Sequence, residues 1–266
     1  MKTLMRYLKI YRVFIVQELK RMMEYKVDFI IGVVSVLAQQ AANLLFIWVI
    51  FSRIPALDGF TMEQIIFIYG FSLLPRGLDH LLFDNLWPFG YWLVNRGEFD
   101  RYLTRPLPTL MHVMFERFQV DALGSIIIGI VLIISVMGSI GIVWSLGNIL
   151  LFLFIIPFAT LIYTALKIAT AAIAMWTKQS GHVIMMFYRL SDFAPYPTSI
   201  FPSVIRGTIT YIIPFAFASF YPASYFLTGE NPWFRLGGTV VVSLLMLAIA
   251  LFIWRRGEKA YESAGS

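Results

Sequence analysis

The sequence predicts an all-α integral membrane protein, and three observations support this fold class. Of its 266 residues, 59% are hydrophobic and only 14% are charged, whereas soluble domains carry about 25% charged residues. The mean hydropathy is +0.76. Long apolar segments alternate with short polar ones along the whole chain, which favours a single membrane domain over residues 1–266.

We expect six transmembrane helices, because a span needs about 20 mostly apolar residues. The fifth is hard to place, because the region 177–229 is apolar but rich in proline. We place it at 182–201, followed by short extracellular re-entrant helices at 203–228. The alternative is an interfacial segment followed by a span at 205–227. The six predicted spans are 27–51, 61–83, 111–137, 147–176, 182–201 and 235–256.

Basic residues lie mainly on one side of the predicted spans. With six spans the two termini share that side, so the positive-inside rule places both in the cytoplasm. Lipid headgroups then explain the net charge of +6 without nucleic acid as a partner. The chain has no cysteine, which excludes disulfides and cysteine-ligated metals.

The leader 1–26 is too charged to be a span. Its apolar residues recur at helical spacing with basic residues between them, which predicts an amphipathic interfacial helix on the cytoplasmic leaflet. A solvated lead-in helix is the alternative.

The cytoplasmic loop 84–110 is too long for a tight turn, and loops of this length usually have a function. Its second half predicts a short helix between Gly97 and Pro106 that places Phe99, Tyr102 and Leu103 on one face. Such a helix suits docking to a soluble partner; an interfacial helix is the alternative. The residues expected to contact the partner are Arg96, Gly97, Glu98, Phe99, Asp100, Arg101, Tyr102, Leu103, Arg105 and Pro106.

Three motifs, in the expected order, resemble ABC type-2 permeases, the membrane subunits of ABC exporters. GEFDRYLTRPL at 97–107 resembles the first coupling helix of these proteins. IIPFAFASFYPASYFLTG at 212–229 and WRRGEKAYESAGS at 254–266 resemble a subfamily described as viologen-exporter-like. The resemblance covers essentially the whole chain.

The resemblance implies a bacterial cell-membrane complex in which two permeases, identical or sister chains, pair above cytoplasmic ABC ATPase subunits. ATP and Mg would be bound by those subunits, and this chain would bind no cofactor. No G-x-x-x-x-G-K-[ST] phosphate loop occurs in the sequence, which agrees with ATP hydrolysis in trans. The leader would be the connecting helix and 203–228 the re-entrant helices.

Charged side chains within spans are costly and are functional candidates by default. Those found here lie near the cytoplasmic ends and predict a polar vestibule that admits substrate or transmits motion. Snorkelling and structural ion pairs are the alternative, which we favour for Arg76 and Arg117. Uncharged polar residues of the first span predict hydrogen bonds across a permease interface, or a substrate path. The candidates are Gln39, Gln40, Asn43, Arg76, Asp79, Glu116, Arg117, Asp121, Lys167, Arg189 and Asp192.

Catalytic motifs are missing from the sequence. His80, His112 and His182 form no HExxH pair, and there is no G-x-S-x-G elbow. We therefore expect a non-catalytic permease subunit of an ATP-driven exporter, which moves a hydrophobic or amphipathic substrate such as a drug or lipid by alternating access. The alternatives are a proton-coupled carrier using Asp79 or Asp121, and a membrane protein of lipid metabolism or assembly.

Overall fold

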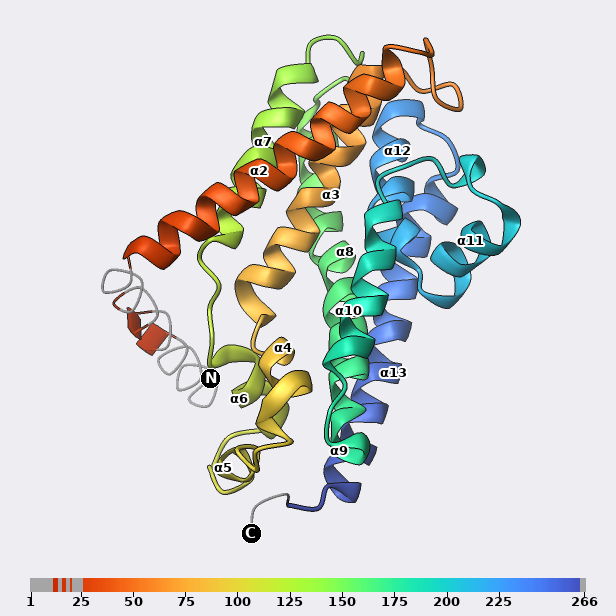
Figure 1. Cartoon of the computed structure of the whole chain (residues 1–266). Helices are drawn as coiled ribbons and strands as arrows, with labels where there is room; N and C mark the ends of the chain where they lie inside the picture. The colour runs from red at the N-terminus through yellow and green to blue at the C-terminus, as the bar shows by residue number, and fades with distance from the viewer. Residues whose placement is uncertain (1–11, 14–15, 18–19, 21–25, 264–266) are drawn as a thin grey trace.

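A computed structural model of the chain describes residues 26–263 together with 12–13, 16–17 and 20. These residues form helices and connecting turns, with no strand among them (Figure 1). Most of the predicted interfacial helix 1–26 lies outside the described residues.

Four helices of the described part of the chain are long and apolar enough to cross a membrane. They coincide with the predicted spans 27–51, 61–83, 147–176 and 235–256. These helices are α2 (Lys26–Phe51), α3 (Met62–Phe83), α8 (Leu146–Ala172) continued by α9 (Ala174–Thr177), and the π-helical turn η6 (Trp233–Gly237) continued by α13 (Gly238–Ala260).

The other two predicted spans are divided into shorter pieces. The segment 111–137 contains the end of α6 (Thr109–Phe115), a break at 116–121, and α7 (Ala122–Val136). The segment 182–201 contains most of α10 (Gly181–Leu190) and the 3₁₀ turns η2 (Ser191–Phe193) and η3 (Thr198–Ile200). At 1.5 Å per residue, neither α7 nor α10 alone crosses a hydrocarbon core of about 30 Å. The count of six spans stays a prediction.

Short helices also fill the remaining segments. The proline-rich region 203–228 forms α11 (Ser203–Gly207), η4 (Thr208–Ile212), η5 (Phe215–Ala218) and α12 (Phe220–Thr228). The loop 84–110 contains α4 (Leu86–Pro88), the π-helical turn η1 (Phe89–Leu93) and α5 (Asp100–Leu103).

Helix α3 is central in the packing and is largely buried. It begins with a capping box, in which the Thr61 hydroxyl accepts a hydrogen bond from the Gln64 backbone and the Gln64 side chain accepts one from Thr61 N. On one side α3 packs against α7 and on the other against α8, which in turn packs along α13. By contrast, α2 leaves most of its apolar side chains exposed, as a lipid-facing helix or a helix with a membrane partner does.

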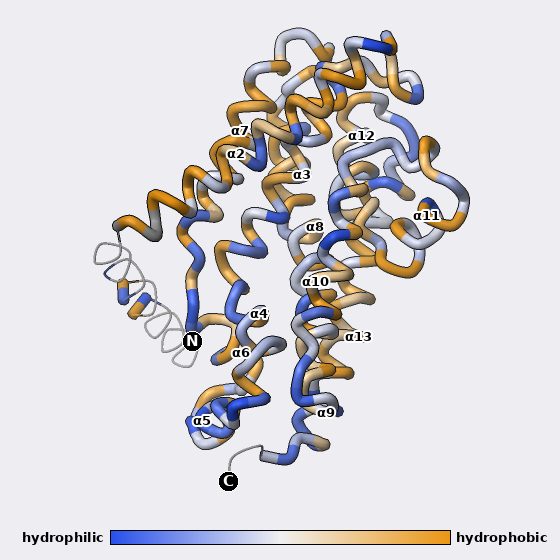
Figure 2. The backbone as a smooth tube through the Cα atoms, in the orientation of Figure 1, coloured by the Kyte–Doolittle hydropathy of each residue, from blue (hydrophilic) through white to orange (hydrophobic). Residues whose placement is uncertain are grey.

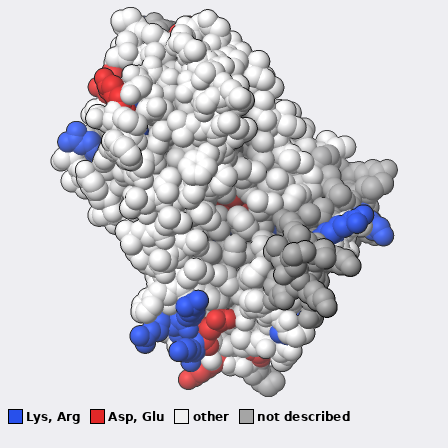
Figure 3. All heavy atoms as spheres, turned by 180° about the vertical axis from the view of Figure 1, so that it is seen from behind, with Lys and Arg blue, Asp and Glu red and all other residues white. Residues whose placement is uncertain are grey.

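Polar residues gather at one end of the molecule. Hydrophobic residues run along α2, α7 and α13, whereas hydrophilic ones concentrate where α5 and α9 lie (Figure 2). Seen from behind, the largest group of Lys and Arg side chains lies at that same lower end, below a broad band almost free of charge (Figure 3). A band of this kind suits the hydrocarbon region of a bilayer.

Candidate functional site

The coupling segment, which we define as residues 96–106, is held against the body of the protein by two buried aromatic residues. Phe99 is fully buried and packs edge-on against Phe89 and Tyr261, with ring centroids 5.0 and 4.9 Å apart. Tyr102 is also fully buried and packs against His112. The helix itself is shorter than predicted, because α5 covers only Asp100–Leu103.

The expectation that Phe99, Tyr102 and Leu103 share one face is wrong for Leu103. Its side chain is 46% exposed, whereas the other two have no exposed surface. The two aromatic rings find apolar partners within the chain, so they anchor the segment and are not available to a second protein. The residues of the segment that are exposed are Arg96, Arg101, Leu103, Thr104, Arg105 and Pro106.

Polar contacts tie the same segment to α6 and its end. The Tyr102 hydroxyl donates a hydrogen bond to the Glu116 carboxylate, and Arg101 Nη2 lies 3.3 Å from the same oxygen. Burial, together with that hydrogen bond, raises the pKa of the Tyr102 phenol to about 12. The hydroxyl therefore remains a donor at physiological pH. Glu116, a predicted vestibule residue, thus belongs to the attachment of the coupling segment.

The C-terminal tail, residues 261–263, also fastens the coupling segment. Tyr261 donates a hydrogen bond of 2.9 Å to Asp100 Oδ1, and Ser263 donates one to the other carboxylate oxygen. Lys178, after α9, donates to the backbone carbonyl of Glu262. These contacts bring together the beginning of α5, the end of α13 and the turn after α9.

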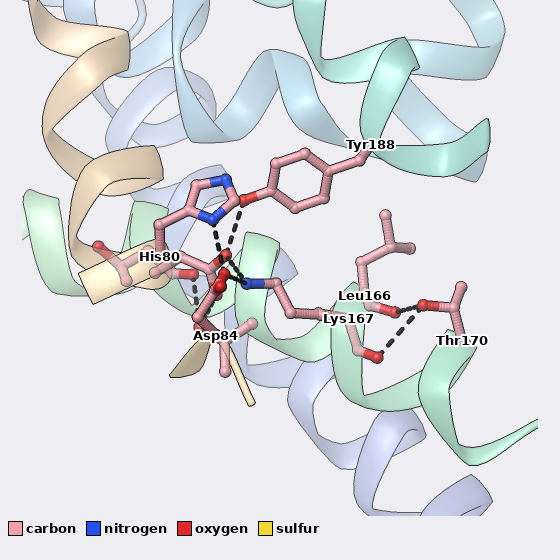
Figure 4. Close-up of polar contacts among 9 residues, drawn as sticks. His80, Asp84, Leu166, Lys167, Thr170 and Tyr188 are labelled. Atoms are coloured by element: carbon pink, nitrogen blue, oxygen red, sulfur yellow. Dashed lines mark hydrogen bonds and ion pairs between the residues drawn. The ribbon is translucent and has the colours of Figure 1, made fainter. Parts of the chain in front are cut away.

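Above this end, charged side chains gather beside one stretch of α3. Asp79 is fully buried and lies 2.7 Å from Lys167 Nζ on α8. Thr164 and Tyr188 donate hydrogen bonds of 2.8 and 2.7 Å to the two oxygens of Asp79. Figure 4 shows this cluster, with Tyr188 reaching in from α10 above Lys167.

The cluster continues toward the end of α3. Asp84 Oδ1 lies 3.7 Å from Lys167 Nζ and 2.8 Å from His80 Nδ1 (Figure 4). A single buried ammonium is thus shared by two carboxylates, which compensates the large cost of removing it from water.

A cavity of about 630 Å³ lies beside the cluster, between α2, α3, the start of α7, and α10. This volume is within the range of small-molecule sites. Arg76 and Asp192 form an ion pair of 2.8 Å in its wall. Seven of the eleven predicted intramembrane residues line this cavity: Gln39, Gln40, Asn43, Arg76, Asp121, Arg189 and Asp192.

The remaining four predicted residues lie elsewhere. Asp79 and Lys167 are buried behind the cavity wall, and Glu116 holds the coupling segment. Arg117 is partly buried, and its Nε is enclosed without a hydrogen-bond acceptor among the described residues. Arg76 pairs with Asp192 and Asp79 pairs with Lys167, and both ion pairs join different helical elements.

The polar residues of α2 bond within the chain. Tyr69 of α3 donates a hydrogen bond to Gln40, and it accepts one of 2.9 Å from Asn43. Gln39 is exposed and bonds weakly to Asn43 in its own helix. Two of the three amides therefore fix α2 against α3.

Several residues of the site have no distinctive sequence signal. His80 stands alone in the sequence, Asp84 falls at the start of a loop, and Tyr188 belongs to an aromatic-rich stretch typical of a headgroup belt. One local clue was present: His80 and Asp84 are four residues apart and meet as an i,i+4 pair. No group of three or more metal-ligating side chains occurs in the described part of the chain.

Comparison with known proteins gives one family. A family model described as ABC-2 family transporter protein matches residues 37–265. No curated protein and no solved structure matches the chain. The family match spans most of the sequence and includes the coupling segment, the C-terminal tail and the cavity residues other than Val36. The chain is therefore a member of the ABC-2 transporter family, a multi-pass membrane permease.

Proposed function

We propose that this chain is the permease subunit of an ATP-driven exporter, related to the viologen-exporter-like permeases, that moves a hydrophobic or amphipathic substrate out of a bacterial cell. It would cross the plasma membrane six times with both termini in the cytoplasm, and it would pair with a second permease, identical or related. Membership of the ABC-2 family implies association with an ATP-binding ABC subunit. The chain itself would hydrolyse no ATP and bind no cofactor.

The observation that carries this proposal is the rigid attachment of the coupling segment. Phe99 and Tyr102 fix it to the core, and Asp100 joins it to the tail that follows α13. A push on its exposed residues would therefore be transmitted to α3, through η1 and α4, and to α13. A loosely held loop would absorb the same push without moving a helix.

The cavity supports the choice of a transporter. It lies beside α3, which leads directly into the loop that carries the coupling segment. Movement of α3 relative to α2 and α10 would change the walls of the cavity and its openings, which is the requirement of alternating access. The apolar character of the surrounding helices favours a hydrophobic or amphipathic substrate.

Co-expression with a candidate ABC ATPase subunit tests the proposal. We expect the two proteins to copurify in mild detergent and to transport a lipophilic dye into inverted vesicles when ATP is supplied. Leu103→Asp should reduce copurification and transport, because Leu103 is the exposed apolar residue of α5. Val204→Asp is the matched control, since Val204 is an exposed apolar residue on α11. Copurification that Leu103→Asp leaves intact would exclude docking through α5.

A proton-coupled carrier is the second candidate, and the placement of Asp121 favours keeping it. This carboxylate lines the cavity and has no ion-pair partner among the described residues, whereas Asp79 is held by Lys167. Dissipating the proton gradient at constant ATP separates the two mechanisms. Transport that stops under these conditions, and that Asp121→Asn also abolishes, would identify a carrier.

A further inference from the structure

The charged residues around the cavity lie at one level of α3. Arg76 pairs with Asp192 and Asp79 with Tyr188, which places the end of α10 beside this part of α3. On the other side, Gln119 N donates a hydrogen bond of 3.2 Å to the Leu81 carbonyl. Asp121, two residues further, therefore lies at nearly the same level.

Most of these charges are compensated within the chain. Arg76 pairs with Asp192, and Asp84 pairs with both His80 and Lys167. Two charged residues of the cavity lining remain without an ion pair among the described residues, and they have opposite signs. They are Asp121, at the start of α7, and Arg189, near the end of α10.

The two residues belong to different walls. Asp121 lies next to α2, where a Cβ atom added at Gly32 would be 3.2 Å from Asp121 Oδ2. Arg189 belongs to α10, which packs against α8 and α4. Asp121 is half-buried and Arg189 is exposed in this structure. Charges within the membrane part of a protein persist where a ligand, water or a partner compensates them.

Neutral hydrogen-bonding groups occupy the lining near these charges. Gln39 and Asn43 contribute amides from α2, and Ser125 and Tyr163 contribute hydroxyls from α7 and α8. Apolar side chains such as Val36 and Leu73 complete the wall. A ligand that fits this cavity would therefore carry a positive charge, a negative charge and polar atoms at one end, with an apolar part beside them.

We propose that the cavity binds the head group of a zwitterionic amphiphile, with its cationic group at Asp121 and its anionic group at Arg189. This inference rests on the proposed function, since it names the substrate class of that transporter. An amphiphile with a single charge would leave one of the two residues unpaired in the same cavity. Burying that residue without a counter-charge costs more free energy than the ion pair at the other residue contributes.

Binding of three amphiphiles with the same twelve-carbon chain tests the proposal. The probes are dodecylphosphocholine, dodecyltrimethylammonium and dodecyl sulfate, each titrated into purified protein in a nonionic maltoside detergent. We expect the zwitterion to bind at least about tenfold more tightly than either singly charged probe, because only the zwitterion compensates both charges of the cavity. The readout is the ratio of affinities within one protein preparation, so a partly unfolded fraction does not alter it.

Two single variants identify the ends of the site. Asp121→Asn should remove the advantage of the zwitterion over dodecyl sulfate, and Arg189→Gln its advantage over dodecyltrimethylammonium. Glu63→Gln and Arg206→Gln are matched controls on exposed residues outside the cavity, and they should leave both ratios unchanged. Equal affinity of the wild type for the three probes would overturn the proposal, as would variants with wild-type ratios.

The binding experiment needs neither ATP nor a partner. If the preference is present but ATP-dependent transport is absent, the proposed function fails and the zwitterion site stands. If transport is present without the preference, the site assignment fails and the exporter stands.

Discussion

Lys167 Nζ lies 2.7 Å from Asp79 Oδ2, and neither side chain has any exposed surface. The pair joins α3 to α8 at the level of the cavity. Its carboxylate also accepts hydrogen bonds from Thr164 and Tyr188, so the second oxygen is satisfied as well. An ion pair completed in this way specifies how α3, α8 and α10 fit together.

Removal of one partner should be more harmful than removal of both. Lys167→Met alone leaves the fully buried Asp79 carboxylate without its counter-ion, which costs about 3–5 kcal/mol. Asp79→Asn alone leaves Lys167 with only the more distant Asp84, 3.7 Å away, and should also lower the free energy of unfolding. The double variant Asp79→Asn with Lys167→Met should recover most of that loss, because neither charge of the fully buried pair remains and Asp84 keeps its contact with His80. Denaturant titration in mixed micelles would measure the free energy of unfolding for all three. A double variant less stable than either single one would contradict the ion-pair interpretation.

The contact of α3 with α7 depends on two facing glycines. A Cβ atom added at Gly129 would lie 2.7 Å from the Gly70 carbonyl oxygen, a backbone atom that cannot move aside alone. Gly129→Ala should therefore lower the free energy of unfolding by about 1–3 kcal/mol, the usual cost of overpacking. Gly138→Ala is the control, since nothing lies within 4 Å of its added Cβ. Equal stability of the two variants would show that α3 and α7 are not in close contact.

The attachment of the C-terminal tail can be tested at Tyr261. Tyr261→Phe removes the hydrogen bond to Asp100 and keeps the ring that packs on Phe99, at a cost of about 1.5–3 kcal/mol for a bond to a charged group. We expect faster hydrogen exchange in residues 99–103 and an unchanged rate in α3. Tyr211→Phe, a change at a residue 77% exposed, should alter neither. Protection of 99–103 that survives Tyr261→Phe would mean that the hydrogen bond from Tyr261 to Asp100 does not hold the coupling segment.

The fold was predictable where hydrophobicity alone decides it. The segments around α2, α3, α8 and α13 are continuous apolar stretches long enough to span a bilayer, and the structure forms a long helix at each. The predicted third span was less simple, because Glu116, Arg117 and Asp121 place three charges within six residues. There the helix breaks, and Gln119 bonds to the carbonyl of Leu81.

The site was predictable as a set of residues but not as a set of partners. The sequence alone identifies Asp79 and Lys167 as candidate functional residues, because the free-energy cost of a charge within a membrane span does not depend on the fold. Their pairing joins positions 88 residues apart, and no local spacing indicates it. The same limitation applies to the coupling segment, where helical periodicity predicts that Leu103 and Phe99 share one face. In the structure Phe99 is buried against Trp254 and Tyr261, whereas Leu103 is exposed.

The difference in burial between Phe99 and Leu103 leads to a prediction about stability. Phe99→Ala should lower the free energy of unfolding by about 3–5 kcal/mol, because a fully buried ring is lost from a cluster that cannot collapse freely around Trp254. Leu103→Ala should change it by less than about 0.5 kcal/mol, as expected for an exposed side chain.

Denaturant titration of the isolated permease distinguishes the two residues, and copurification with the ATPase subunit then completes the comparison. Leu103→Ala should weaken copurification at unchanged stability, whereas Phe99→Ala should weaken both together. If Phe99→Ala weakened copurification at wild-type stability, the ring would have to face the partner, contrary to its burial against Phe89 and Tyr261. The docking surface would then be the one that helical periodicity predicts.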